Sequence, residues 1–172
     1  MMEAFWTSVS DGTLRQGDLL LRCPVPILPP DLKVDVTISV AMRYHDVVVI
    51  NQSCDLEQRK VRGVALLSVT SVPEFEKNNP VFAKKGRWNE VLKGRAEGLH
   101  LLASPVEPED NRQALVVDFR EIYSLPYDVL TAHAASLGPR WRLRSPYLEH
   151  FSQAFARFFM RVGLPSTIPE FR

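Results

Sequence analysis

The clearest hydrophobic pattern in the chain is a run of four β-branched apolar residues, Val47-Val48-Val49-Ile50. β-branched side chains fit a pleated, packed surface, so this run predicts a strand that is buried on both faces. The run stops in Asn51-Gln52-Ser53-Cys54-Asp55, whose short polar side chains can hydrogen-bond their own backbone. We therefore expect the chain to turn, or to line a cavity, where this strand ends.

Similar patterns predict further strands along the chain. Alternating apolar and polar residues are typical of a half-buried strand, and a continuous apolar run is typical of a fully buried one. We expect strands at 16–24, 32–40, 47–52, 64–70, 98–102 and 114–125, and a short alternating segment at 141–144. The first strand should end at Pro24, because proline cannot donate to a central ladder. Residues 1–13 have the pattern of a short lead-in closed by a turn.

One long helix is predicted near the end of the chain, over 145–163. Six apolar residues recur there at spacings of three and four: Leu148, Phe151, Phe155, Phe158, Phe159 and Val162. Ser145 would be the N-cap, Pro146 the first helical residue and Gly163 the C-cap. Shorter helices are expected at 74–79, 88–93 and 127–136. The apolar face of the long helix would pack on the body of the protein or, alternatively, on a partner.

Short strands separated by turns and followed by one long helix predict a mainly β (α+β) fold. We expect a small β-barrel with short helical insertions and a long amphipathic C-terminal helix. The 172 residues are enough for a single domain with a sizeable core. The barrel core would span 16–125, and the helix at 145–163 would follow it.

Charge is nearly balanced over the whole chain but uneven along it. The formal net charge is +1, so the overall charge indicates neither nucleic acid nor membrane. Five basic residues and one acid lie between Lys84 and Arg95, and Trp141-Arg142 combines stacking with charge, as sites for single-stranded RNA do. The candidate substrate-binding residues are Asn51, Lys84, Lys85, Arg87, Trp141 and Arg142. The alternative is that these are ordinary solvated, turn-capping or packed side chains.

Cysteine and histidine usage favours a reducing, cytoplasmic setting without a metal or cofactor. The chain has two cysteines, Cys23 and Cys54, and shows no signal-peptide pattern or apolar run of membrane length. Its four histidines lack metal-ligand spacing. Cys54 is a candidate nucleophilic thiol, although the neighbouring Asp55 would raise its pKa. The alternative is a small buried side chain in a turn.

Four short motifs follow one another in a recognisable order: Gly17-Asp18-Leu19-Leu20, Val47–Ile50, Ala65–Ser71 and Val116–Ile122. This order resembles that of the PemK/MazF-like proteins, toxin endoribonucleases built on an SH3-like barrel. The resemblance covers roughly residues 16–125. It implies an SH3-like barrel, a role in a toxin–antitoxin or bacterial defence module, and metal-independent cleavage of RNA.

The resemblance also implies a set of catalytic residues. The family uses an arginine near the start of the second core strand and a hydroxyl residue at the end of the third, which correspond by position to Arg43 and to Thr70 or Ser71. The arginine would balance the negative charge that develops on the phosphate. Asp118 matches the family's strand aspartate. His45 is an added candidate for proton transfer, because its reference pKa lies near neutrality.

Some features depart from the family pattern. The family's Arg-Pro before the strand is replaced by Arg43-Tyr44-His45-Asp46, the first loop is rich in proline, and the late helix has no counterpart. These departures favour an alternative function. The chain would then be a non-catalytic SH3-like barrel that docks a protein partner, or a second copy, through its C-terminal helix.

Overall fold

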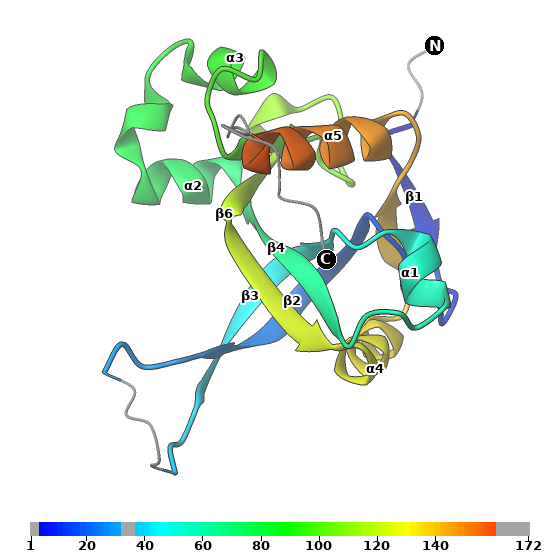
Figure 1. The fold of residues 1–172 in the computed structure, drawn as a ribbon. Coiled ribbons are helices and arrows are strands. Elements are labelled where there is room, and N and C mark those ends of the chain that lie inside the picture. Colours follow the sequence, from blue (N-terminus) through cyan, green and yellow to red (C-terminus); the bar gives the residue numbers. More distant parts are fainter. Residues whose placement is uncertain (1–3, 32–36, 161–172) are drawn as a thin grey trace, which may run out of the picture.

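The computed structural model describes residues 4–31 and 37–160, which fold into a mixed α and β structure (Figure 1). Seven strands form one antiparallel sheet in the order β1-β7-β2-β3-β4-β6-β5. The strands are β1 (Trp6–Val9), β2 (Asp18–Ile27), β3 (Ala41–Val49), β4 (Gly63–Ser71), β5 (Leu99–Leu102), β6 (Leu115–Pro126) and β7 (Arg140–Leu143). The α-helices are α1 (Ser53–Glu57), α2 (Val72–Asn78), α3 (Arg87–Leu92), α4 (Tyr127–Leu137) and α5 (Tyr147–Phe159). In this part of the chain no helix is long and apolar enough to cross a membrane.

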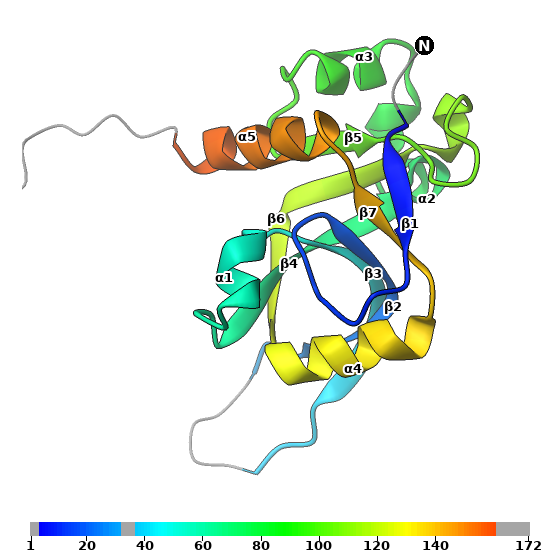
Figure 2. The same ribbon diagram turned by 90° about the vertical axis from the view of Figure 1, so that its right-hand side faces the viewer.

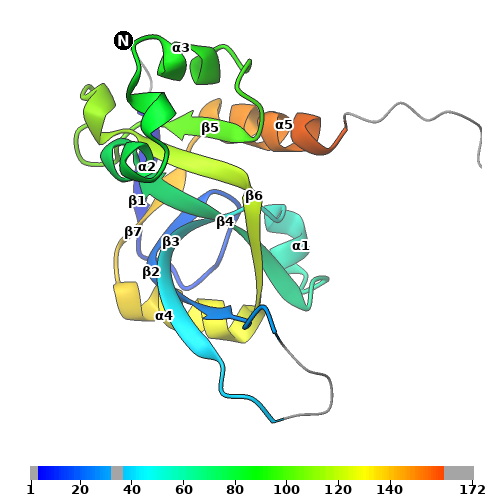
Figure 3. The same cartoon turned by 90° about the vertical axis from the view of Figure 1, so that its left-hand side faces the viewer.

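The sheet curls strongly without closing into a barrel, so the expectation of a closed barrel over 16–125 is corrected (Figures 2 and 3). Among the described residues, β1 and β5 are the two end strands and no backbone ladder joins them. A side chain bridges the gap instead, because the Trp6 indole donates to the Ala103 carbonyl at 2.7 Å, just after β5. β1 and β7 extend the sheet with residues from outside 16–125.

Most predicted strands are confirmed, and the differences have physical reasons. Val47, Val48 and Val49 of β3 are fully buried, as their run predicted. β2 continues through Pro24 to Ile27, because beyond Leu20 it pairs with β3 alone and an edge strand tolerates proline. Residues 37–40 form no strand and 32–36 lie outside the described residues, so the strand predicted at 32–40 is not confirmed. The strand predicted at 47–52 is β3, which begins earlier, at Ala41, and ends at Val49. β1 lies within the predicted lead-in and was missed.

The predicted helices are also largely present. α2, α3 and α4 occupy the predicted segments, and α1 forms where a turn was expected. α5 begins at Tyr147, after Pro146, so the prediction of Ser145 as N-cap is wrong: the N-cap position is Pro146, without a side-chain cap hydrogen bond. Val162 and Gly163 lie outside the described residues.

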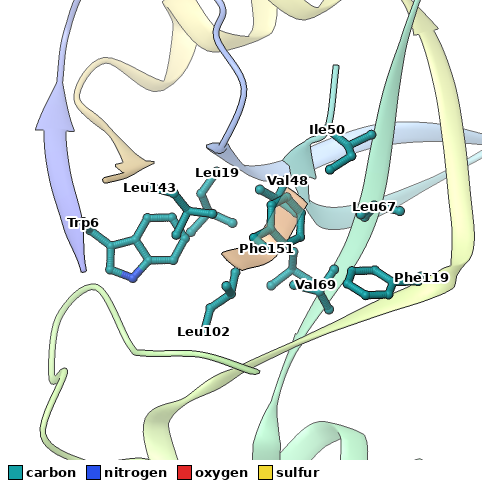
Figure 4. Packing of buried hydrophobic residues seen from close by; sticks show 11 residues of the cluster. Trp6, Leu19, Val48, Ile50, Leu67, Val69, Leu102, Phe119, Leu143 and Phe151 are labelled. Carbon is teal, nitrogen blue, oxygen red and sulfur yellow. The ribbon is translucent and has the colours of Figure 1, made fainter. Parts of the chain in front are cut away.

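α5 packs on its own sheet through an aromatic face. Phe151 is fully buried in a cluster with Val48, Leu67 and Phe119, and Phe155 and Phe158 pack against the same cluster (Figure 4). The opposite face of the sheet packs against α1 and α4, with Leu56 and Leu130 fully buried. The central strands are therefore covered on both sides, which explains why their sequence is a continuous apolar run.

A buried ionic cluster joins the start of β2 to β7. Asp18 is fully buried, and its carboxylate accepts from Arg140 Nε at 3.0 Å and also from Arg142 Nε. Both guanidinium groups also reach the loop before β2, where each donates to the Thr13 carbonyl and to Asp11. The pKa of Asp11 is raised by partial burial but lowered overall, chiefly by its hydrogen bond and proximity to Arg142. Two cations and two carboxylates thus neutralise one another at the base of the sheet.

Gly17 allows this junction to form. Its φ of +81° favours glycine, and a Cβ there would lie 2.9 Å from both Leu143 Cβ and Leu148 Cδ1. Its backbone bridges two strand ends, since its N–H donates to the Val49 carbonyl and its carbonyl accepts from Leu143 N–H. Gly17-Asp18 is thus a structural junction between β2, β3 and β7.

Replacing Asp18 should strongly destabilise the fold. In Asp18→Asn the buried Arg140 loses its buried anionic partner and keeps only the half-exposed Asp11, and breaking a buried ion pair from one side costs about 3–5 kcal/mol. Chemical denaturation of Asp18→Asn and of Asp31→Asn, an exposed control, measures this loss. The control should change the free energy of unfolding by less than about 0.5 kcal/mol. Equal stability of the two variants would contradict a structural role for the cluster.

His100, on β5 beneath α5, should remain neutral well below neutral pH. Burial, followed by the nearby His150, lowers its pKa to about 4. Because an unfolded histidine titrates near 6.5, the unfolded chain binds more protons between about pH 6.5 and 4, and stability should fall as pH falls through that window. NMR titration of the His100 ring measures this directly, and His100→Phe should lose less stability over the same window. A titration midpoint of the His100 ring near pH 6.5 in the folded protein would show that the ring is not buried under α5.

Candidate functional site

β3, β4 and β6 are neighbours in the sheet, and β6 bends sharply along its length (Figure 3). Leu67 of β4 pairs with Ile122, but the next residue, Ser68, pairs with Asp118. Three residues of β6, 119–121, are therefore extra in the ladder. Bulges of this kind bend a strand and redirect its side chains. Here the bend places Arg120 and Glu121 beside the end of β4.

A cavity of about 310 Å³ opens at this bend. Ser68 and Thr70 of β4 form one part of its wall, and residues from α2 and β6 form the rest. The other lining residues are Phe75, Asn78, Asn79, Asp118, Arg120 and Glu121. Two residues that the sequence singled out, Thr70 and Asp118, therefore meet in one cavity although 48 positions separate them in the chain.

His45 lies close by, under the second half of β6. Its ring stacks on Tyr123 with the ring centroids 5.5 Å apart and the planes 27° from parallel. Its Nε2 is buried and has no hydrogen-bond partner among the described residues. Leaving such a nitrogen unsatisfied costs about 1–3 kcal/mol, so this exception calls for a functional explanation.

A bulge in the neighbouring strand helps to position His45. Leu20 of β2 pairs with Val47, and Cys23 pairs with His45, so β2 carries two residues opposite Asp46 alone. The Asp46 carboxylate stabilises this bulge by accepting from Arg22 N–H at 2.8 Å. Arg22 has a left-handed φ of +49°. The segment that carries Arg43 and His45 is thus held against a distorted partner strand.

Tyr123 links the two parts of the site. Burial and the nearby Glu121 carboxylate raise its pKa, and Arg43 and the Ser68 hydroxyl partly oppose that rise. Arg43, whose side chain is exposed, is therefore near enough to act on the phenol electrostatically. The Tyr123 hydroxyl is protonated at neutral pH, as in an ordinary tyrosine, and the raised pKa makes it a weaker acid.

Asp118 and Arg120 form an ion pair in the cavity wall. Arg120 Nε donates to Asp118 Oδ1 at 2.8 Å, and its Nη2 donates to Oδ2 at 2.6 Å. Asp118 raises the pKa of Arg120 through these hydrogen bonds. The carboxylate thus orients a second guanidinium, which presents an additional cation beside Thr70.

The structure places several candidate residues away from this cavity. Ser71 is the N-cap of α2 and accepts from Glu74 N–H. Asn51 accepts from Ala65 N–H at 2.5 Å, which ties the end of β3 to β4. Arg142 is bound to Asp18 and Asp11, and Trp141 packs against the aromatic core cluster. These four side chains have structural roles that account for their positions.

The predicted basic residues Lys84, Lys85 and Arg87 are exposed in the turn that leads into α3. They belong to an insertion, residues 72–98, whose first helix ends at the cavity with Asn78 and Asn79. The insertion has its own small core, in which the Phe75, Phe82 and Trp88 rings contact one another. The basic turn is therefore carried on a packed unit adjoining the site.

The two cysteines differ in environment. Cys54 is exposed in α1, so the interpretation of a buried turn residue is wrong. Its sulfur lies 3.7 Å from Gln52 Oε1 and 3.9 Å from Asp55 Oδ1, which are acceptors that do not favour a thiolate. Cys23 is fully buried, and burial raises its pKa to about 11. Neither thiol lines the cavity at the bend of β6.

Sequence reasoning missed Ser68, Arg120, Glu121 and Tyr123. The Asp118-Phe119-Arg120 spacing is the one sequence signal that indicates a carboxylate–guanidinium pair, since alternate residues of a strand share a face. Tyr123 could not be inferred, because its place beside His45 depends on the bulge at residues 119–121.

Comparison with known proteins adds no assignment. The chain matches no protein-family model, and it has no significant match among curated proteins. Within the described ranges, no group of three or more His, Cys, Asp or Glu side chains is arranged to hold a metal ion. The function is therefore inferred from the geometry of the site.

The pKa of Tyr123 should depend on the positive charge of Arg43. In Arg43→Ala the loss of a nearby positive charge disfavours the tyrosinate, so the Tyr123 pKa should rise further. NMR titration of ¹³C-labelled tyrosine measures this shift. Arg59→Ala is the matched control, because Arg59 lies over the Tyr127 ring, 5.1 Å from its centroid, and should leave Tyr123 unchanged. An unchanged Tyr123 titration in Arg43→Ala would show that the two side chains are not neighbours.

Proposed function

We propose that this chain is a PemK/MazF-like protein that binds and cleaves RNA without a metal, at the cavity lined by β4, α2 and β6. The observation that carries the proposal is that Thr70 and Asp118 line this one cavity, while Arg43 and His45 lie on the neighbouring strand β3, beside Tyr123. Arg43, Thr70 and Asp118 correspond by position to the catalytic set that the family resemblance implies, and His45 is the added candidate for proton transfer.

The topology is compatible with the SH3-like part of the proposal. Five consecutive antiparallel strands, β2-β3-β4-β6-β5, curl around the core that contains Leu20, Val47 and Leu66. The side-chain bridge from Trp6 to Ala103 brings the two ends of the sheet together. We propose that this curled sheet is an SH3-like barrel opened at one seam and extended by β1 and β7.

The proposed reaction is an internal transesterification of RNA. The ribose 2′-hydroxyl gives its proton to His45, directly or by way of the Thr70 hydroxyl, and O2′ forms a bond to phosphorus while the bond from phosphorus to O5′ breaks. The products are a 2′,3′-cyclic phosphate and a 5′-hydroxyl. Arg43 balances the charge that develops on the phosphate oxygens, and Arg120, held by Asp118, adds a second cation.

The departing 5′-oxygen needs a proton, and we propose that the Tyr123 hydroxyl gives it. A tyrosine is protonated at neutral pH, and this one stacks on His45 and lies near Arg43. The proton that His45 gains can restore the tyrosine after each turnover. The exposed Lys84, Lys85 and Arg87 on the adjoining insertion would attract the phosphates of the incoming strand.

A non-catalytic interaction module is the second candidate, and exposed apolar side chains favour it. Phe151 of α5 packs against the sheet of the same chain. Phe159 and Met160, at the end of the helix, remain exposed. The β2–β3 hairpin projects from the body and exposes Leu28, Met42 and Tyr44 (Figure 1). A protein partner or a second copy would bind at one of these surfaces rather than at the cavity.

RNA cleavage by the purified full-length chain in EDTA tests the proposed function. The wild type should cut single-stranded RNA and leave 2′,3′-cyclic phosphate ends. Removing one electrostatic stabiliser of a transition state costs about 10²–10³-fold in rate, so Arg43→Ala should lower cleavage by that factor. Loss of proton transfer in His45→Ala or Thr70→Ala should lower it by about 10²-fold or more.

Arg144→Ala is the matched control, since Arg144 is exposed and lies before α5, outside the cavity lining. It should cut RNA at the wild-type rate. Circular dichroism of every variant verifies folding. Absence of cleavage by folded wild type, or full cleavage by folded Arg43→Ala, would contradict the proposal and favour the interaction module.

A further inference from the structure

A second, larger cavity lies on the opposite side of β6, outside the site described above. Its volume is about 510 Å³, and it opens between the α3–β5 connection and α5. That size is within the range of small-molecule sites, about 300–1,000 Å³. Its walls come from residues 91–100, from Phe119 of β6, and from His150, Gln153, Ala154, Arg157 and Phe158 of α5.

The floor of this cavity is aromatic. The Phe119 ring is buried and stacks on the His100 ring, with the centroids 6.0 Å apart and the planes 19° from parallel. The centroid of the Phe158 ring also lies 6.0 Å from that of Phe119, with the two planes tilted by 52°. A pKa near 4 keeps His100 uncharged at neutral pH, so it offers a flat face and a neutral hydrogen-bonding ring.

The rim carries the charge. Lys93 after α3 and Arg157 of α5 are both exposed cationic side chains that line the opening, and His150 stands beside them. Glu97 is the one acidic residue among the lining side chains. An apolar, aromatic floor below a cationic rim matches a ligand that has a flat ring at one end and an anionic group at the other.

We propose that this cavity binds a nucleotide, with the base against the half-buried His100 and Phe158 rings and the phosphate between Lys93 and Arg157. Base–aromatic stacking contributes about 1–3 kcal/mol per base, and guanidinium binds phosphate through paired, charge-assisted hydrogen bonds. The ligand is either a free mononucleotide or one unit of a longer RNA.

The position of the cavity favours a unit of RNA. Asp118 lines the first cavity and the next residue, Phe119, lines the second, so the two cavities share one segment of β6 as a wall. The Arg120 stem packs over Gly98, which lines the second cavity. This arrangement rests on the proposed function. An RNA molecule that is cut beside Thr70 would pass around the edge of β6 and place a neighbouring base in the second cavity.

Calorimetric titration of the full chain with adenosine 5′-monophosphate, uridine 5′-monophosphate, adenosine and inorganic phosphate tests the proposal. The two monophosphates should bind more tightly than adenosine or phosphate alone. In Arg157→Ala the affinity for the monophosphates should fall about tenfold or more, whereas the affinity for adenosine should stay the same. Arg62→Ala, an exposed arginine in the α1–β4 loop, is the matched control and should bind as the wild type does.

A short oligonucleotide with 2′-deoxyribose at each position separates the two sources of the ligand, because it cannot be cleaved through a 2′-hydroxyl. Tighter binding of this oligonucleotide than of the monophosphates, weakened in both Arg157→Ala and Arg43→Ala, supports a flanking subsite. If the oligonucleotide and the monophosphates bind with equal affinity, and only Arg157→Ala weakens that binding, the ligand is a free nucleotide. Both binding results can occur with or without RNA cleavage. Failure of the nucleotide site can therefore be told apart from failure of the proposed function, which the cleavage assay tests.

Two outcomes would overturn the inference. One is that neither monophosphate nor the oligonucleotide binds to folded wild type at millimolar concentration. The other is that binding occurs but Arg157→Ala and Lys93→Ala leave it unchanged, since both side chains are exposed and neither substitution should disturb the fold.

Discussion

The structure depends on one buried carboxylate. Asp18 is fully buried at the start of β2 and is neutralised by Arg140 and Arg142 of β7. Because an unpaired buried charge is costly, the two arginines strongly favour the pairing of β7 with β2. That pairing joins the beginning of the chain to the segment just before α5, and α5 then covers the sheet with Phe151. The cluster that looks basic in the sequence at Arg140–Arg144 is therefore largely a structural element.

Two irregular strands, rather than regular ones, create the candidate site. The bulge in β2 at Leu21–Arg22 lies opposite Asp46, and the bulge in β6 at residues 119–121 lies beside Ser68. Between them His45, Tyr123 and Thr70 gather near one cavity, and the two cavities share the β6 wall. Regular pairing would have left Phe119 and Arg120 opposite β4. The departures from ideal geometry are thus located where the chain concentrates its polar and aromatic chemistry.

The sequence predicts the regular parts of this structure and not the long-range ones. The buried run at Val47–Ile50 and the aromatic spacing of α5 locate a central strand and the helix that covers it, because burial and periodicity are local signals. Thr70 and Asp118 could be selected from the order of motifs. The spacing of Asp118 and Arg120 on one strand face could have indicated Arg120 as well. Tyr123 could not be selected, because it reaches His45 through a bulge that no local pattern shows. Arg142 was misjudged as a substrate ligand because its partner, Asp18, is 124 residues away.

RNA that binds at the bend of β6 should perturb the residues around it. NMR mapping of the ¹⁵N-labelled chain with a 2′-deoxy-substituted RNA that cannot be cleaved measures this. The largest chemical-shift changes should occur at Arg43, His45, Thr70, Asp118 and Tyr123, and Arg43→Ala should abolish them. Binding that leaves these five residues unperturbed, or no binding by the folded chain, would show that RNA is not recognised at this site.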